Sequence, residues 1–277
     1  MTAARAAVAA LHRHPVKSLL GEQLASADVT ERGITGDRAL ALLDTATGRI
    51  ASAKHPRLWQ RLLTLTATTD ATGVRLTGPG LHTHSTDPDV DKQLSALLGR
   101  DVTLTGTPPE IPLLDRADPD AVLRDGITDT TPLTVGNVGT GAPPGTFFDF
   151  APVHLITTAT VNRIGALHPD GAADARRYRP NIVVHTDATG FAEDAWVGRE
   201  LRIGDDLRLR VIAATPRCAV PTLAHGDLPR DPDALRVLAE YHRVVPLPSL
   251  APQPCAGVYA QVVHPGRIRP GDAVRDA

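Results

Sequence analysis

Cys218 is the residue of this chain whose type and neighbours point most directly to chemistry. It follows a β-branched and apolar run and lies beside Arg217, within residues 214–222. A cysteine reacts and binds metals as the thiolate, and a neighbouring cation in a partly exposed loop favours that form. The alternative is inert packing, because free cysteines are among the most often buried residues. Cys255 has no adjacent charge and precedes an apolar run, so we expect it to pack in the core.

A second group of residues has the character of an anion site. Arg177, Arg179 and Asn181 open onto an apolar run, so a strand would anchor two cations and an amide. Lys17 lies in the turn 15–18 and is one of only three lysines in the chain. A guanidinium fork and a compact ammonium together suit phosphate. A solvated side chain is the alternative for Lys17, because most lysines are exposed.

The composition argues against several classes of function. The formal charge of −2 and the lack of a basic block disfavour nucleic acid and membrane surfaces as partners, and favour small molecules or proteins. Two cysteines cannot build a disulfide framework, an iron–sulfur cluster or a structural zinc site. No apolar stretch approaches the ~18 residues of a membrane span and no signal peptide is recognisable, so we expect a cytoplasmic protein. The usual hydrolase, nucleotide and dinucleotide motifs are absent from the sequence.

Several other polar residues are expected to have structural roles. The 11 histidines are scattered without the spacing of a metal-binding pair, so His12, His14, His154 and His225 are not assigned to a metal site. Asp149 is interpreted as a turn or cap residue and not as an acid catalyst.

The pattern of turns and apolar residues predicts a mainly β (α+β) fold with a few helices. Short strands punctuated by glycines fill the first hundred residues, including one at 57–67, and their spacing suits a barrel or sandwich. Apolar residues at helical spacing predict helices over 88–98, from Thr157 or Thr158 through Leu167, and over 231–242. Between 106 and 145 prolines, glycines and aspartates interrupt every pattern, which predicts a lid or a disordered linker.

Four short motifs, in this order, resemble the molybdenum cofactor sulfurase C-terminal (MOSC) family with its N-terminal β-barrel region. They are Pro15-Val16-Lys17-Ser18, Gly36-Asp37-Arg38, Arg179-Pro180-Asn181-Ile182 and Arg217-Cys218, and the pattern of 257–272 completes them. The resemblance covers nearly the whole chain. It implies an N-terminal β-barrel-like region (1–105), an insert (106–145) and a MOSC domain (146–277) with a MOSC-type β-barrel. His14 is a departure, because the family usually has an aromatic residue there.

The nearest subgroup is similar to the amidoxime-reducing component, which holds a molybdenum–pterin cofactor and reduces N-hydroxylated compounds. The resemblance implies a molybdenum-dependent oxidoreductase that acts on a small-molecule substrate by oxygen-atom transfer. The iron–sulfur and pyridoxal-phosphate domains of some relatives are not recognised in this sequence, so we expect neither of those cofactors. The resemblance then implies a separate electron-donor protein of the ferredoxin or flavoprotein type.

The resemblance also implies roles for individual residues. Cys218 would be the catalytic thiolate and the protein ligand of molybdenum, and a soft thiolate suits a metal already bound by sulfur. Two alternatives stay open, a sulfur carrier with a persulfide on Cys218 and a non-enzymatic carrier of the cofactor. Eight residues are assigned to cofactor binding: Lys17, Ser18, Arg38, Thr157, Thr158, Arg179, Asn181 and Arg217.

Overall fold

The computed structural model describes residues 6–277 and is built around a closed barrel of seven strands. These strands are β1 (Ala6–Arg13), β13 (Val153–Thr157), β14 (Ile182–Thr186), β15 (Glu200–Ile203), β16 (Leu207–Pro216), β18 (Gln253–His264) and β20 (Ala273–Asp276). Their order around the ring is β13-β14-β1-β20-β15-β16-β18, and β18 pairs with β13 to close it. Only the β13–β14 pair is parallel among these described strands. Closure leaves the ring without unpaired strand edges.

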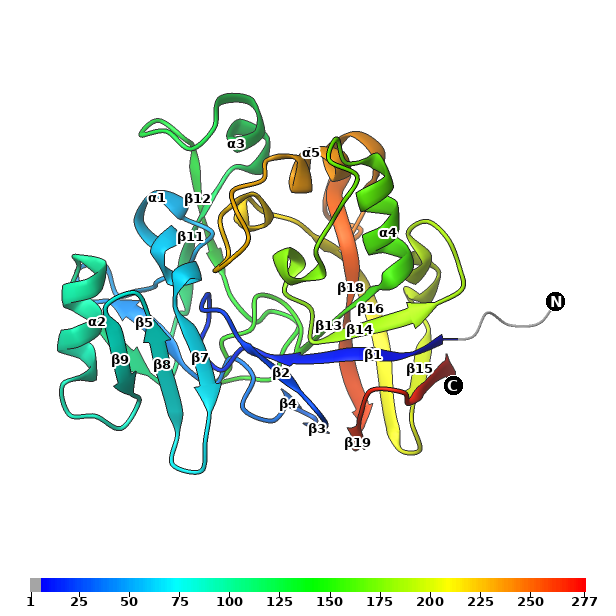
Figure 1. The fold of residues 1–277 in the computed structure, drawn as a ribbon, viewed down its shortest axis with the longest axis horizontal. Coiled ribbons are helices and arrows are strands. Elements are labelled where there is room, and N and C mark those ends of the chain that lie inside the picture. The colour runs from blue at the N-terminus through cyan, green and yellow to red at the C-terminus, as the bar shows by residue number, and fades with distance from the viewer. Residues whose placement is uncertain (1–5) are drawn as a thin grey trace.

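Alternation of apolar and polar residues explains why these segments form barrel strands. In β16 the side chains of Leu207 and Leu209 are buried, whereas Arg208 and Arg210 between them are exposed. This period of two places one face of each strand in the core. β1 supplies Val8 and Leu11 to the same core as the late strands, and Figure 1 shows it beside β14. The prediction of a mainly β fold with a β-barrel is confirmed.

Smaller β elements surround the barrel. β2 (Glu22–Leu24) extends the barrel sheet at β1, and β17 (Arg243–Val244) extends it at β18. Three three-stranded sheets contain β3 (Ala27–Thr30), β4 (Gly33–Ile34) and β19 (Gly266–Ile268); β5 (Ala41–Asp44), β6 (Arg49–Ile50) and β10 (Val102–Thr105); and β7 (Thr66–Thr69), β8 (Val74–Gly78) and β9 (Leu81–His84).

A second core forms among the N-terminal sheets, where helix α2 (Val90–Leu98) buries Val90 and Leu94. α2 confirms the helix predicted over 88–98, and Gly99 ends it in the left-handed conformation. The strand predicted at 57–67 is wrong. The segment instead forms helix α1 (Pro56–Trp59) and the 3₁₀ helix η1 (Gln60–Thr64) before β7. Proline suits a first helical turn, and Trp59 and Leu62 bury one helical face.

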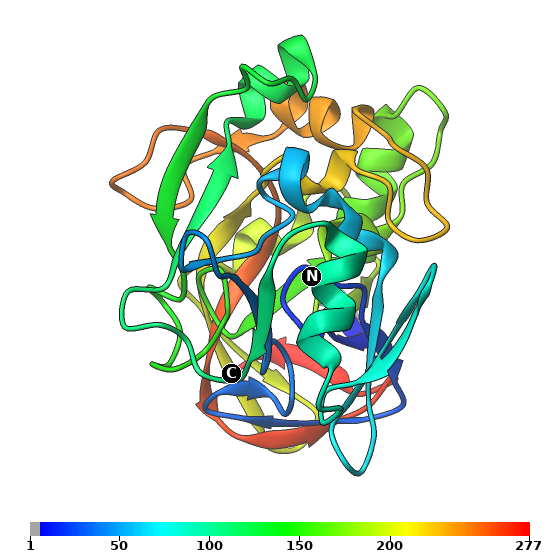
Figure 2. The same cartoon turned by 90° about the vertical axis from the view of Figure 1, so that its left-hand side faces the viewer.

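The segment 106–145 contains regular structure that the sequence did not predict. It forms β11 (Leu113–Ala117), helix α3 (Pro119–Asp125) and β12 (Leu133–Asn137), and the two strands pair as an antiparallel hairpin. Asp118 caps α3 by accepting a hydrogen bond from the backbone of Ala121. Figure 2 shows this hairpin along one side of the molecule with α3 at its upper end.

Two helices cover the barrel on the side of β14 and β18. α4 (Thr158–Leu167) and α5 (Asp233–Tyr241) confirm the two helices predicted there. No helix in residues 6–277 is long and apolar enough to cross a membrane. Three short 3₁₀ helices complete the fold: η2 (Ala175–Tyr178), η3 (Ala192–Trp196) and η4 (Val220–Thr222).

Candidate functional site

Cys218 lies in the loop between β16 and η4, where it packs in one cluster with Leu63 and Leu223. It is 8% exposed and lines a cavity between the barrel and the N-terminal sheets. Cys218 is therefore a buried residue that borders this cavity. Seven predicted site residues line this cavity together: Lys17, Ser18, Arg38, Arg179, Asn181, Arg217 and Cys218.

Backbone strain is concentrated at this cavity. Ser18 (φ 67°), Arg38 (φ 45°) and Arg179 (φ 54°) are the non-glycine residues of the described chain with positive φ. Residues other than glycine rarely adopt this conformation, and it costs about 1–3 kcal/mol where it persists. All three are among the residues that the family resemblance assigns to cofactor binding. Strain that the surrounding structure maintains at three points of one cavity is typical of a binding site.

Asp37 holds two of the predicted residues in place. Its buried carboxylate accepts a hydrogen bond from Nδ2 of Asn181 at 2.9 Å and pairs with the guanidinium of Arg38. It also accepts from the backbone nitrogen of His14 at 2.6 Å. Oδ1 of Asn181 accepts in turn from the backbone nitrogen of His154 at 3.1 Å, which ties the motif around Asp37 to the barrel.

Arg217 is fixed by the backbone and by a neutral histidine. Its Nη1 donates to the carbonyl of Tyr178 at 2.9 Å, and its backbone nitrogen donates to the carbonyl of Pro254 at 2.8 Å. Burial and the charge of Arg217 hold the pKa of His154 well below its usual range. The imidazole is therefore uncharged, and its Nε2 faces Nη2 of Arg217 at 3.4 Å. These contacts define where the Cys218 loop leaves β16.

Lys17 and Asp149 form an ion pair in the wall of the cavity. Nζ of Lys17 lies 2.6 Å from Oδ1 of Asp149 and donates to the carbonyl of Phe147 at 2.8 Å, and Lys54 contacts the same carboxylate at 2.9 Å. Burial lowers the pKa of Lys17 to about 8, although Asp149 opposes the shift. Burial alone would raise the pKa of Asp149, but the two lysines hold it well below its usual range. Asp149, interpreted from sequence as a turn residue, thus belongs to the cavity.

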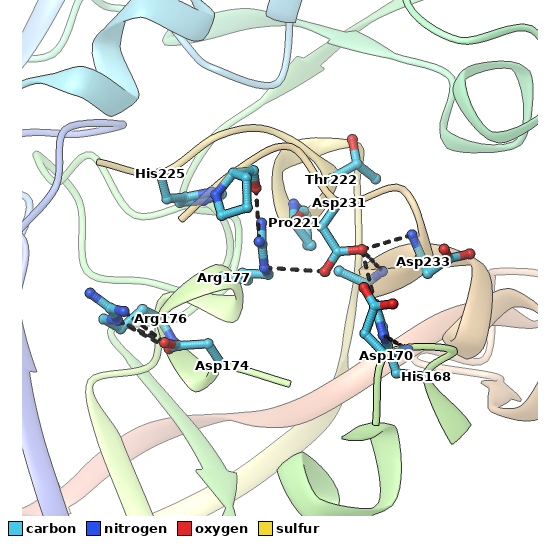
Figure 3. Close-up of polar contacts among 12 residues, drawn as sticks. His168, Asp170, Asp174, Arg176, Arg177, Pro221, Thr222, His225, Asp231 and Asp233 are labelled. Carbon is cyan, nitrogen blue, oxygen red and sulfur yellow. Dashed lines mark hydrogen bonds and ion pairs between the residues drawn. The ribbon is translucent and has the colours of Figure 1, made fainter. Parts of the chain in front are cut away.

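Arg177 clamps the loop that follows Cys218. Its guanidinium donates to the carbonyls of Leu223 at 3.1 Å and Pro229 at 2.8 Å, and Nε lies 3.3 Å from Oδ2 of Asp231. Figure 3 shows Arg177 directed at Asp231, whose other oxygen lies 3.0 Å from Nε2 of His168. Asp231 also accepts from the first backbone amides of α5. The loop is therefore tied to α5 through a buried ion pair.

The structure does not bring Thr157 and Thr158 into the cavity. Thr157 caps α4, and its hydroxyl donates to Oε2 of Glu193 at 2.5 Å. The hydroxyl of Thr158 accepts from the backbone nitrogen of Thr186 at 3.3 Å. Helix capping and buried hydrogen bonds occupy both side chains, which separates them from the other six residues assigned to cofactor binding.

Several cavity residues were not identified from sequence. Tyr259 is half-buried next to His154, with 5.8 Å between ring centroids, and desolvation raises the pKa of its phenol to about 12. Arg116, from the hairpin of β11 and β12, also lines the cavity. Asp37 was visible within a quoted motif, whereas Tyr259 and Arg116 carry no local signal.

The fold and this cavity define a β-barrel protein that surrounds a single thiol with cations suited to an anion. The sequence matches the MOSC domain over residues 143–275 and the MOSC N-terminal beta barrel domain over residues 5–106. The chain belongs to the MOSC family, which is linked to binding of the molybdenum cofactor and is commonly associated with enzymes that use it. The family resemblance is thereby confirmed.

Two solved structures resemble this fold at low sequence identity. The YuaD protein from Bacillus subtilis is 12% identical, with a TM-score of 0.45, and the alignment covers 98% of this chain and 94% of that one. YiiM from Geobacillus stearothermophilus is 13% identical, with a TM-score of 0.34 and coverage of 60% and 75%. No curated protein matches the sequence.

The donor set of the cavity fits a cofactor that carries phosphate and sulfur. Lys17, Arg38 and Arg179 are phosphate donors, and Nη1 of Arg179 is buried without a partner. Cys218 supplies the one thiol among the described lining residues. The open volume is about 80 Å³, below the about 300–1,000 Å³ typical of small-molecule sites. A pterin would therefore enter only if residues that line the cavity moved.

Proposed function

We propose that this protein is a molybdenum-cofactor-dependent reductase of N-hydroxylated compounds, similar to the amidoxime-reducing component. The observation that carries the proposal is the convergence on one cavity of the Cys218 thiol and three strained residues, Ser18, Arg38 and Arg179. A site built only to shield a cysteine would have no reason to maintain strained cations around it.

The chain's own residues have distinct parts in this proposal. Lys17, Ser18 and Arg38 would hold the phosphate of the cofactor, and Arg179 and Asn181 would contact its phosphate or pterin edge. Cys218 would be the thiolate ligand of the metal. When bound, the molybdenum cofactor supplies the oxygen-atom transfer chemistry that removes the hydroxyl oxygen from nitrogen.

Protons must also reach the substrate, because reduction of an N–OH group to N–H with release of water consumes two electrons and two protons. The electrons would come from a separate donor protein of the ferredoxin or flavoprotein type. Asp149 is the one carboxylate among the described lining residues, and its side chain is 36% exposed. Asp149 stays ionised, because Lys17 and Lys54 hold its pKa well below the usual range. Lys17 is the member of the pair that can release a proton to the cavity near neutral pH, because burial lowers its pKa to about 8.

The test measures molybdenum per chain in protein purified from a host that makes the cofactor, together with reduction of benzamidoxime by an artificial reductant. We expect about one molybdenum per chain and N–O reduction, both lost in Cys218→Ser. Cys255→Ser is the matched control, because Cys255 is fully buried and burial raises its pKa to about 12. We expect this control to retain both properties.

Three outcomes would contradict the reductase. If the protein contained no molybdenum when purified from a host that loads a control molybdoenzyme, it would not be a molybdenum-cofactor protein. A persulfide on Cys218 that passes to an acceptor would favour the sulfur carrier. Stoichiometric molybdenum without turnover of any N-hydroxylated compound would favour a cofactor carrier.

A further inference from the structure

A second cavity shares Arg179 with the cavity that contains Cys218. Its volume is about 310 Å³, and its polar wall includes His12, His14, Arg176, Arg179 and His225. Arg179 lines both cavities, whereas Cys218 lines only the first. His12 and His14 come from β1 and the turn after it, and His225 comes from the loop that Arg177 clamps. In Figure 3 His225 and Arg176 lie on the side of Arg177 that faces away from Asp231.

Buried polar atoms without partners gather in this second cavity. Both ring nitrogens of His14, Nη1 of Arg179 and Nε2 of His225 have no hydrogen-bond partner, which is four of the nine such atoms in residues 6–277. His14 is 8% exposed and His225 is 3% exposed. Buried polar groups are nearly always satisfied, because an unmade hydrogen bond costs the desolvation of the group. All three residues line the cavity, so a polar ligand bound there would lie beside the groups that lack partners.

The hydrogen-bonding character of the two histidines restricts what can bind. Nδ1 of His225 lies 2.9 Å from the carbonyl of Leu223, so it carries the proton. Burial lowers the pKa of His225 to about 4, and Arg179 adds to the shift, so the ring is neutral and Nε2 is an acceptor. Burial, with Arg179 next, also holds the pKa of His14 well below its usual range, so this ring also offers one acceptor.

Arg179 supplies the positive charge that an anion bound in the second cavity would need. Its Nη2 donates to the carbonyl of Leu19 at 2.7 Å, which fixes the guanidinium and leaves Nη1 free for a ligand. The two carboxylates of the cavity have cations of their own: Glu22 pairs with Arg13 at 2.9 Å and Asp227 with Arg176 at 2.9 Å. Within the described residues, no carboxylate forms an ion pair with Arg179.

We propose that this second cavity binds a small oxyanion that keeps a proton, with a charged oxygen on Nη1 of Arg179 and an O–H group donated to Nε2 of His225. Hydrogen phosphate has this combination at neutral pH. Sulfate has the same shape and charge but carries no proton. Its oxygens only accept hydrogen bonds, so none of them can donate to Nε2 of His225. The proposal does not require molybdenum or Cys218, but it shares Arg179 with the cofactor site of the proposed function.

Isothermal titration calorimetry of the purified chain at pH 7 with inorganic phosphate and with sulfate tests the proposal. We expect phosphate to bind at least roughly tenfold more tightly than sulfate, and His225→Leu to weaken phosphate by about the same factor. His185→Leu is the matched control, because the His185 side chain is 61% exposed on β14. Lys17→Ala removes a cation of the first cavity alone and should leave phosphate affinity unchanged.

NMR of the histidine ring nitrogens tests the proposal on the unsubstituted protein, so the result does not depend on whether the variants fold. Phosphate should shift the ring nitrogens of His14 and His225 and leave those of His185 unchanged. Equal affinity for sulfate, loss of binding in Lys17→Ala, or unchanged ring signals at saturating phosphate would overturn the proposal. In cofactor-loaded protein, retained phosphate binding would identify a free ion as the ligand. Lost binding would instead show that the phosphate end of the cofactor reaches the same groups.

Discussion

Nε2 of His154 lies 3.4 Å from Nη2 of Arg217, and Nδ1 of the same ring lies 3.4 Å from the carbonyl of Arg179. The ring is neutral, and we assign its proton to Nδ1, which faces a carbonyl, so that Nε2 accepts from Arg217. A single neutral imidazole thus links the arginine beside Cys218 to the backbone of the strained Arg179. Disturbing this ring should disturb the cavity from both sides.

Gly257→Ala provides that disturbance. Gly257 has φ 78°, and a Cβ there would lie about 2.5 Å from the carbonyl oxygen of Leu155 and would overlap the His154 ring. We expect the variant to lose about 3 kcal/mol of unfolding free energy in urea denaturation. Gly80→Ala is the control, because Gly80 has φ 76° with open space around it, and it should lose about 1 kcal/mol from backbone strain alone. Equal losses in the two variants would show that the His154 contact is unimportant.

Asp37→Asn should destabilise the protein by about 3 kcal/mol. The substitution keeps the shape of the side chain but leaves the partly buried Arg38 without its counterion and gives Asn181 a poorer acceptor. Asp28→Asn is the comparison, because the Asp28–Arg267 pair is exposed and 3.6 Å long and should contribute less than about 1 kcal/mol. Thermal denaturation compares the two variants, and we expect Asp37→Asn to melt at the lower temperature. A similar melting temperature for the two would refute a structural role for Asp37.

Arg177→Lys should loosen the loop after Cys218 without unfolding the barrel. Lysine cannot reproduce a fork that contacts two carbonyls and Asp231 together. Hydrogen exchange should become at least roughly tenfold faster at the amides of Leu223 and Asp231, whose acceptors lie in this loop. Arg236→Lys, on the exposed face of α5, should leave exchange there unchanged, and a uniform increase across the barrel would contradict a local clamp.

Stability should fall as the pH drops below about 6.5. The pKa of His225 is lowered to about 4, so between these values the unfolded chain binds a proton that the folded chain does not. His225 therefore lowers the unfolding free energy by up to about 1.4 kcal/mol per pH unit, or about 2 kcal/mol between pH 6.5 and 5, and the buried His14 and His154 act in the same direction. His225→Gln should reduce this slope in urea denaturation at the two pH values. His185→Gln should keep it, and parallel slopes for all three proteins would show that His225 does not titrate in this range.

The sequence predicted those parts of the site that depend on residue type within a short segment. Lys17, Arg38, Arg179 and Asn181 lie in motifs. The fold brings Lys17 and Asn181 together because Lys17 follows β1, Asn181 precedes β14, and these two strands pair in the barrel. The alternation of apolar and polar residues in the barrel strands and the helical spacing of apolar residues in α2 are likewise visible within short segments of the sequence. Regular spacing of apolar residues can be recognised from the sequence alone, without knowledge of the three-dimensional structure.

What the sequence could not predict depends on partners distant in the chain. Asp149 looks like a turn residue until Lys17 is placed against it, 132 residues away in sequence. Thr157 follows an apolar strand and precedes a helix, where a cap and a pocket residue have the same local pattern. In 106–145 the capping signal at Asp118 was present, but proline-rich surroundings concealed the hairpin.

The position of β1 between β14 and β20 means that the matched MOSC segment 143–275 is not a separable folding unit. Expressed alone, it would lack the strand that joins these neighbours, and both would present unpaired backbone to solvent and to other copies. During synthesis, likewise, β1 has its second barrel neighbour only after β20, far later in the chain, has been made. The barrel closes only then, and the cavity around Cys218 takes its final form with it.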